Sequence, residues 1–409
     1  MGELYASCPL DRTRREIRLL TLQPNNDEDM TRCSLQTYSP EDCPSYTALS
    51  YTWGADVMHT DIEINGVSVP IRENLWDFLH QQLLHENYGP FWIEAVCIQQ
   101  SEVDERNHQV QMMGSIYSNA RKVLVWLGKE GEDSDLAIRA LTTWTWSRRY
   151  SGRALPNLFP NEDKDSKKAT KENESATIWT REEARSVLSL CGRAYWSRMW
   201  IIQEVLLALD KEVHCGTLRL KWYKLVQLYD YLDKVKFSTN QEAFTPFHNV
   251  LMKSGAMRIA NNTSMTRGPS NKLSFNLLFQ MYGDHECAEI RDKVYALVGV
   301  GRYGSVLELD YRRPVKDILL DVFYLEIIRW SWERQGGGHD SKYDTGYLLE
   351  RVLGVPFPED EVSFHLNCSS DIAREVYHRL YDQPQLDFSD AFARARQSMY
   401  YTAKSHPSK

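Results

Sequence analysis

The stretch "TALSYTWG", residues 47–54, decides the fold class. Its β-branched and aromatic residues predict a strand that ends at Gly54. Two further apolar runs, "FWIEAVCI" (91–98) and "KVLVWLG" (122–128), predict buried strands. Between them, residues 103–118 carry apolar side chains at helical spacing. Strands that alternate with helices in this way predict βαβ units and a parallel sheet covered by helices on both faces.

A second local signal is "TDIEINGVSVPI", residues 60–71. Apolar residues alternate on both sides of Asn65-Gly66, a dipeptide that favours a two-residue turn between antiparallel strands. We therefore predict a β-hairpin insertion in the α/β domain. After residue 210 a short strand pair is followed mainly by helical pattern.

These patterns predict three segments. Residues 1–45 form an N-terminal lead-in, and residues 46–210 form the α/β domain. Residues 211–409 form a mainly helical C-terminal region that packs on this domain. A charged stretch at about 155–178, of which 161–175 has no apolar residue except Ala169, predicts a flexible, solvated loop within the domain.

Composition and charge exclude several classes of function. The net charge is −8, from 48 basic and 56 acidic residues, without a basic cluster, so we expect no nucleic-acid partner. No apolar run approaches the length of a membrane span, and the N-terminus lacks the features of a signal peptide. The eight cysteines form no C-x-x-C pair, which favours a reducing compartment; we expect a cytoplasmic protein.

Sequence motifs for metals, phosphates and nucleophiles are weak. The eleven histidines show no H-x-x-x-H spacing, so we expect no metal. The glycines of "GVGRYG" (299–304) fit a nucleotide-binding pattern, but they follow a predicted helix rather than a strand. Ser50 within its strand and Cys97 at a strand end have no base nearby in the sequence, so a Ser or Cys hydrolase lacks support.

Two acidic residues interrupt apolar segments. Glu94 lies in the predicted strand 91–98 and is buried if both faces of the sheet are covered. Glu204 lies in "MWIIQEVLLAL" (199–209), whose apolar residues surround the helix and predict burial, with Trp200 on the same face. A buried carboxylate needs a cation or hydrogen-bond donors, or it stays protonated. Both acids have structural alternatives: an ion pair for Glu94, and solvation or pairing with Arg198 for Glu204.

Several stretches, in order, resemble the heterokaryon-incompatibility (HET) domain of filamentous fungi. They are "YTALSYTWG" (46–54), "IRENLWDFLHQQL" (71–83), "FWIEAVCIQQ" (91–100), "RNHQVQMMGSIYSNARKVLVWLG" (106–128), "YWSRMWIIQEV" (195–205), "IRDKVYALVGV" (290–300) and "LDYRRPV" (309–315). The sequence departs from the usual pattern at Glu94 and Gln99, where the family commonly has Asp and Asn.

HET domains are in turn distantly similar to TIR domains, and this likeness implies a flavodoxin-like parallel sheet. In enzymatic TIR domains a Glu in the matching stretch cleaves the nicotinamide–ribose bond of NAD, so the resemblance assigns catalysis to Glu204. A carboxylate suits this step because nicotinamide loss leaves an oxocarbenium-like ribose. The resemblance places further residues around the pocket, with Trp53 and Trp200 as stacking walls: Ser50, Tyr51, Trp53, Gly54, Glu94, Arg198, Trp200 and Gln203.

The resemblance implies a role in fungal non-self recognition, regulated cell death and innate immunity. Two molecular hypotheses follow. The first is an NAD glycohydrolase that uses NAD as a substrate and needs no cofactor. The second is a signalling module without catalysis, which acts through self-association or recruitment of a protein partner.

Overall fold

The computed structural model describes residues 2–24, 30–55, 59–131, 133–145, 179–238, 246–263, 272–333, 341–356 and 392–393. The chain divides into two compact units, residues 1–267 and 268–409. The charged loop predicted at about 155–178 lies outside the described residues. The sequence-based boundaries at 1–45, 46–210 and 211–409 stay predictions.

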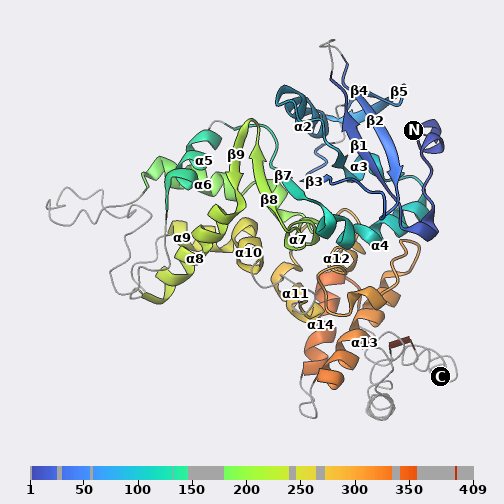
Figure 1. The fold of residues 1–409 in the computed structure, drawn as a ribbon. Coiled ribbons are helices and arrows are strands. Elements are labelled where there is room, and N and C mark those ends of the chain that lie inside the picture. Colours follow the sequence, from blue (N-terminus) through green and yellow to red (C-terminus); the bar gives the residue numbers. More distant parts are fainter. Residues whose placement is uncertain are drawn as a thin grey trace, which may run out of the picture. The chain divides into compact units, whose positions relative to one another are not determined.

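The described strands of the first unit form one sheet of nine strands (Figure 1). Their order across the sheet is β5-β4-β2-β1-β6-β3-β7-β8-β9. In chain order, the strands are β1 (Ile17–Leu22), β2 (Arg32–Tyr38), β3 (Thr47–Tyr51), β4 (His59–Ile64), β5 (Val67–Arg72), β6 (Phe91–Trp92), β7 (Lys122–Trp126), β8 (Lys211–Cys215) and β9 (Leu218–Lys221).

The sheet is mixed, which confirms the α/β class and corrects the expectation of a parallel sheet. The central strands β6, β3, β7 and β8 run parallel to one another. β1 pairs antiparallel with both β2 and β6, and β9 pairs antiparallel with β8. Consecutive strands joined by short links pair antiparallel, whereas parallel neighbours need a long crossover. The parallel prediction therefore holds for the central strands β6, β3, β7 and β8.

The predicted hairpin is confirmed as β4 and β5. Ile62 pairs with Val69 and Ile64 with Val67, and the turn residues Asn65 and Gly66 have positive φ angles of 52° and 79°. Such angles are those of a type I′ turn, which matches the twist of the strands. β4 also pairs parallel with β2, so the hairpin extends the sheet.

The predicted strand at 91–98 is wrong after its second residue. β6 ends at Trp92, and residues Glu94–Cys97 form the short helix α3. Its turn is closed by bonds from the Cys97 amide to the Ile93 carbonyl and from the Ile98 amide to the Glu94 carbonyl. A short apolar run does not by itself separate a buried strand from a buried helix, which explains the error.

Helices flank the sheet of the first unit, and Figure 1 shows α5 and α6 beside β9, far from α2 beside β4 and β5. Helix α7 packs on β3 and β7, and all six of its residues are buried, as predicted. The helices of this unit are α1 (Gly2–Ser7), η1 (Arg12–Arg14), α2 (Glu73–Leu84), α3, α4 (Val103–Asn119), α5 (Ser134–Thr143), α6 (Arg181–Cys191), η2 (Ala194–Ser197), α7 (Ile201–Leu206), α8 (Trp222–Ser238), α9 (Pro246–Lys253) and α10 (Gly255–Asn262).

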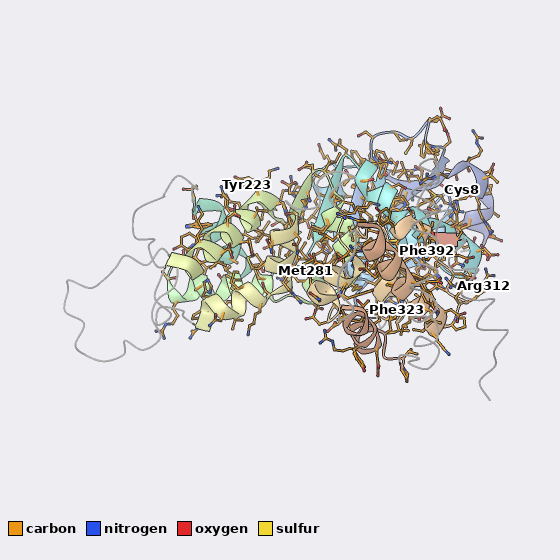
Figure 2. The ribbon with its side chains drawn as sticks, turned by 90° about the horizontal axis from the view of Figure 1, so that it is seen from below. Cys8, Tyr223, Met281, Arg312, Phe323 and Phe392 are labelled. Atoms are coloured by element: carbon orange, nitrogen blue, oxygen red, sulfur yellow. The ribbon has the colours of Figure 1, made fainter. Side chains whose placement is uncertain are left out.

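The described part of the second unit is helical, as expected. α11, α13 and α14 pack against one another, with Phe275, Phe279, Phe323 and Leu349 buried among them; Phe323 is labelled on α13 in Figure 2. The elements of this unit are α11 (Phe275–Tyr282), α12 (Asp292–Tyr295), η5 (Gly304–Val306), α13 (Val315–Glu333) and α14 (Ser341–Leu353).

A buried ion pair joins the lead-in to the rest of the first unit. Arg18 on β1 is 1% exposed, and its guanidinium contacts both carboxylate oxygens of Glu105 on α4, at 2.6 and 3.0 Å. Arg18 also donates to the carbonyls of Cys8 and Cys97. The Gln99 amide donates to Glu105. Both charges are therefore satisfied on several sides, as a buried pair requires.

We predict that Arg18→Met lowers the free energy of unfolding by about 3–5 kcal/mol, because it leaves the carboxylate of Glu105 buried without its cation. Urea denaturation measures the change. Arg12→Met is the matched control, since Arg12 pairs with Glu102 at the surface, where the side chains are 49% and 37% exposed. This control should cost less than about 1 kcal/mol. Equal losses in the two variants would contradict the prediction.

Candidate functional site

The carboxylate of Glu204 is buried at the centre of the first unit. Glu204 on α7 is 2% exposed and accepts a hydrogen bond from the hydroxyl of Ser50, the fourth of the five residues of β3. Ser50 is fully buried, and its oxygen lies 2.6 Å from the hydroxyl of Tyr195 on η2. Since Ser50 has one proton, which it gives to Glu204, the Tyr195 hydroxyl donates to Ser50. A hydrogen-bond chain thus connects η2, β3 and α7 and ends at the carboxylate of Glu204.

Arg198 supplies the positive charge near this acid. It follows η2, is half-buried and donates a hydrogen bond to the carbonyl of Tyr51 at the end of β3. Burial lowers the pKa of Arg198, but the charges of Glu204 and Glu94 outweigh this effect, so its pKa is raised. Arg198 therefore stays charged and acts on both carboxylates.

Burial raises the pKa of Glu204 to about 7, from an ordinary value of 4.5. Arg198 and the Ser50 hydrogen bond lower this pKa but do not offset burial, and the charge of Glu94 raises it further. An acid that titrates near neutral pH exchanges its proton under cellular conditions. Perturbed acids of this kind gather at functional sites, although structural networks also produce them.

Glu94 lies in the first turn of α3 and is half-buried rather than buried within a strand. One of its carboxylate oxygens accepts from the Trp53 indole N–H at 3.3 Å, and the other from the Gln100 side-chain amide at 3.3 Å. Both donors come from loops that follow secondary-structure elements. Glu94 therefore links the charged network around Arg198 to these loops.

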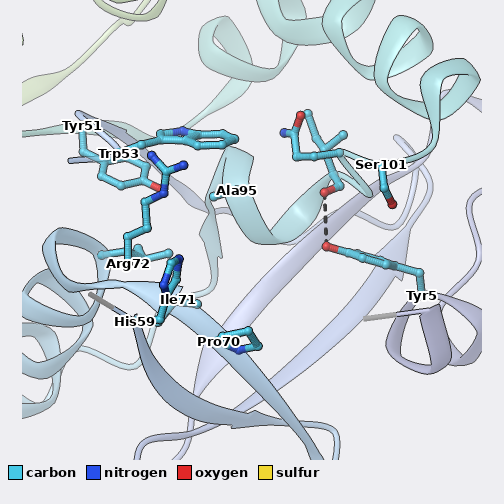
Figure 3. A pocket seen from close by; sticks show the side chains of 12 residues that line it. Tyr5, Tyr51, Trp53, His59, Pro70, Ile71, Arg72, Ala95 and Ser101 are labelled. Atoms are coloured by element: carbon cyan, nitrogen blue, oxygen red, sulfur yellow. Dashed lines mark hydrogen bonds between the residues drawn. The ribbon is translucent and has the colours of Figure 1, made fainter. Parts of the chain in front are cut away.

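A cavity of about 390 Å³ lies beside Glu94, within the usual size range of small-molecule sites (Figure 3). Its apolar lining consists of Pro70, Ile71, Leu75, Ala95 and Ile98. Aromatic and polar side chains complete the wall, namely Tyr5, Tyr51, Trp53, His59, Arg72, Gln100 and Ser101. Glu204 and its partner Ser50 do not line this cavity, whereas Tyr51, the next residue of β3, does.

The structure brings most of the predicted site residues into two adjoining groups. Ser50, Glu204 and Arg198 belong to the buried network, whereas Tyr51 and Trp53 line the cavity and Glu94 lies between the two groups. Gly54 has a positive φ of 78°, and its carbonyl accepts a hydrogen bond from Arg72. Trp200 is half-buried and Gln203 is buried. Neither lines this cavity, and their predicted binding roles stay predictions.

Sequence reasoning missed several residues of the site. Tyr195 lies in the stretch "YWSRMWIIQEV", whose aromatic spacing is a signal that could have identified it. His59 and Arg72 face each other across the hairpin ladder, so the register of the predicted hairpin carried that information. Tyr5 had no signal, because α1 is distant in sequence from every other part of the cavity.

In the part of the chain that the structure describes, no group of three or more His, Cys, Asp or Glu side chains is arranged to hold a metal ion. None of the helices in the described ranges is long and apolar enough to cross a membrane.

Residues 46–204 match the family model described as "Heterokaryon incompatibility protein (HET)". The chain is 27% identical over 370 residues to "Heterokaryon incompatibility protein 6, OR allele" of Neurospora crassa, an alignment that covers 81% of the chain and 54% of that protein. The chain thus spans about half the length of this curated relative. No solved structure matches the chain, so the likeness to TIR domains stays a prediction.

We predict that Glu204 makes stability fall as the pH rises. Its pKa is raised in the folded state, so the folded protein holds a proton that the unfolded chain releases above pH 4.5. The resulting stabilisation is complete below pH 4.5 and is lost by about pH 7, a change on the order of 3 kcal/mol. Urea denaturation of wild type and Glu204→Gln across this range measures it, because the variant lacks the titration.

The difference between the two pH profiles is the informative quantity. Burial lowers the pKa of His214 to about 4, which makes stability rise with pH over the same range and partly hides the effect of Glu204 in the wild type. Glu182→Gln, on the exposed face of α6, should leave the wild-type profile unchanged. Parallel profiles for wild type and Glu204→Gln would refute the assignment of this titration to Glu204.

Proposed function

Since residues 46–204 form a heterokaryon-incompatibility domain, we propose that this chain acts in the non-self recognition of filamentous fungi and in the cell death that follows it. The Neurospora crassa relative supports this role by its name and by its similarity along most of the chain. The role concerns the fusion of genetically different cells.

At the molecular level, we propose hydrolysis of the nicotinamide–ribose bond of NAD. The observation that carries this proposal is the acid pair Glu204 and Glu94, which both act electrostatically on Arg198, with Glu94 bonded to Trp53 in the wall of a cavity. The departing nicotinamide leaves positive charge on the ribose, which a nearby carboxylate stabilises. Trp53 offers a flat surface for a ring at the cavity wall.

The two acids have different access to a bound substrate. Glu94 lies beside the cavity, with its carboxylate oriented by Trp53 and Gln100. Glu204 is buried and does not line the cavity, so its contact with Ser50 has to open before its carboxylate reaches a ribose. A raised pKa in the resting state and a fall on opening would supply the charged form when it is needed.

The enclosure of Glu204 favours a second function, a signalling module without catalysis. A carboxylate that is bonded to Ser50 and Tyr195 through one hydrogen-bond chain also serves to fix α7 against β3. In this alternative the domain acts through self-association or partner recruitment, and the acid network maintains the surface that the partner recognises.

We predict that the purified protein releases nicotinamide from NAD, and that Glu204→Gln and Glu94→Gln each reduce the rate roughly a hundredfold or more, because each removes a charge that stabilises the transition state. Chromatography of released nicotinamide measures the rate. The control is Glu182→Gln, an identical change on the exposed face of α6.

Incompatibility assays in a fungal host separate the two functions. The enzymatic proposal expects Glu204→Gln to abolish cell death at unchanged protein abundance and without a loss of folding stability. Cell death at the wild-type level in this variant, together with no nicotinamide release by the wild type, would reject hydrolysis and leave the signalling module.

A further inference from the structure

Tyr195 is held in place by contacts on both sides of its ring. The ring packs edge-on against that of Trp196, with 4.9 Å between the two centroids. The indole N–H of Trp196 donates to the carbonyl of Leu190 on α6 at 2.9 Å. Just before η2, Arg193 donates to the carbonyl of Leu127, which follows β7, at 2.9 Å. Anchors to α6 and to the end of β7 therefore fix the position of the Tyr195 hydroxyl.

This hydroxyl acts on Glu204 through Ser50. The two hydroxyl oxygens lie 2.6 Å apart, and Ser50 donates to the Glu204 carboxylate. All three side chains belong to residues that are 2% exposed or less. Burial, and after it the charge of Glu204, raises the pKa of Tyr195, so its hydroxyl keeps its proton and remains a donor. The Ser50 oxygen accepts this bond, and its own proton is directed to Glu204.

A chain of this polarity favours the charged form of the acid at its end. A hydrogen bond to an ionised acceptor is about twice as strong as one between neutral groups, and successive bonds in a chain strengthen one another. The bond from Ser50 accordingly lowers the pKa of Glu204, against the larger effect of burial. The charges that act on this acid are those of Arg198, after η2, and Glu94 on α3.

Other titratable groups on the surrounding elements lie outside this chain. Helix α7 packs on α4, α10, β3 and β7. Tyr117 on α4 and Tyr51 on β3 both have pKa values that burial raises first and the charge of Glu204 raises further. Arg258 is the charged residue of α10 and Lys122 that of β7. The pKa shift of Glu204 arises from burial, Arg198, Ser50 and Glu94 rather than from these two cations.

We propose that Tyr195 and Ser50 are positioning residues for Glu204: Tyr195 turns the Ser50 proton toward the carboxylate, and Ser50 holds that carboxylate against β3 in the resting domain. This role deepens the proposed function and rests on it only for the reaction that Glu204 serves. The chain acts on the proton equilibrium of Glu204 whether or not NAD is a substrate.

The pH dependence of stability tests this role in the intact chain. The stabilisation contributed by Glu204 is lost as the pH rises through its folded pKa, about 7 in the wild type. In each background, urea denaturation compares the protein with and without Glu204→Gln, and the pH above which the difference becomes constant reports that pKa. We expect Tyr195→Phe to move this pH upward by about half a pH unit and Ser50→Ala by about one unit or more, because each weakens the bonding of the charged acid. Ser50→Thr, which keeps the hydroxyl, should restore the wild-type position.

Tyr117→Phe is the matched control. It removes the hydroxyl of another buried tyrosine, which donates to the Leu49 carbonyl beside Ser50 on β3 at 3.0 Å, and it leaves the hydrogen bond of Glu204 intact. This control should lose stability equally at every pH and keep the wild-type titration. A shift in Tyr195→Phe no larger than that in Tyr117→Phe, or no shift in Ser50→Ala, would overturn the proposal. If Ser50→Ala does not fold, the comparison of the two tyrosine variants decides.

The outcome is separable from that of the proposed reaction. The expected shifts without nicotinamide release by the wild type support the positioning role and count against hydrolysis. Nicotinamide release by the wild type, with the same titration of Glu204 in every variant, supports hydrolysis and rejects the positioning role.

Discussion

A carboxylate that has lost its water must find partners in the protein, and the burial of Glu204 imposes this constraint on the centre of the first unit. Its partner Ser50 lies 154 residues earlier in the chain, on β3, and Tyr195 reaches the same hydroxyl from η2. These contacts set the position of α7 against β3. Because Arg198 then bonds the Tyr51 carbonyl, the same constraint fixes the strand end from which the cavity wall begins.

The carboxylate of Glu105 is also buried, but its partner Arg18 compensates its charge directly. There, two oxygens meet two guanidinium nitrogens, and backbone groups satisfy the remaining positions, so the charges are locked. Around Glu204 the balance is closer, because burial outweighs the attraction of Arg198 and keeps the pKa of the acid near neutral pH. The first network holds the lead-in in place. The second titrates near neutral pH, so its charge responds to changes in its surroundings.

The local pattern of the sequence predicted the elements that depend on neighbouring residues. Asn65-Gly66 specified the hairpin through its turn, and the apolar residues of α7 predicted its burial. The register of β1 between β2 and β6 depends on contacts distant in sequence, and no local pattern encodes it. For the same reason Glu94 and Glu204 were identifiable as unusual acids, whereas Ser50 as the partner of Glu204, and Tyr5 as a cavity wall, required the fold. The strand predicted at residues 91–98 was wrong after Trp92, because burial gives strands and helices the same apolar composition.

The position of β1 and β2 in the sheet shows that the segment matched by the family model is shorter than the unit that folds. The family match begins at residue 46, yet these two earlier strands lie between β4 and β6, in the interior of the sheet. At the other end, β8 and β9 follow residue 204 and complete the sheet beyond β7. A fragment limited to 46–204 would detach the hairpin and expose unpaired strand edges, which promote aggregation. Recombination that moved this domain between proteins would therefore have to carry both flanks with it.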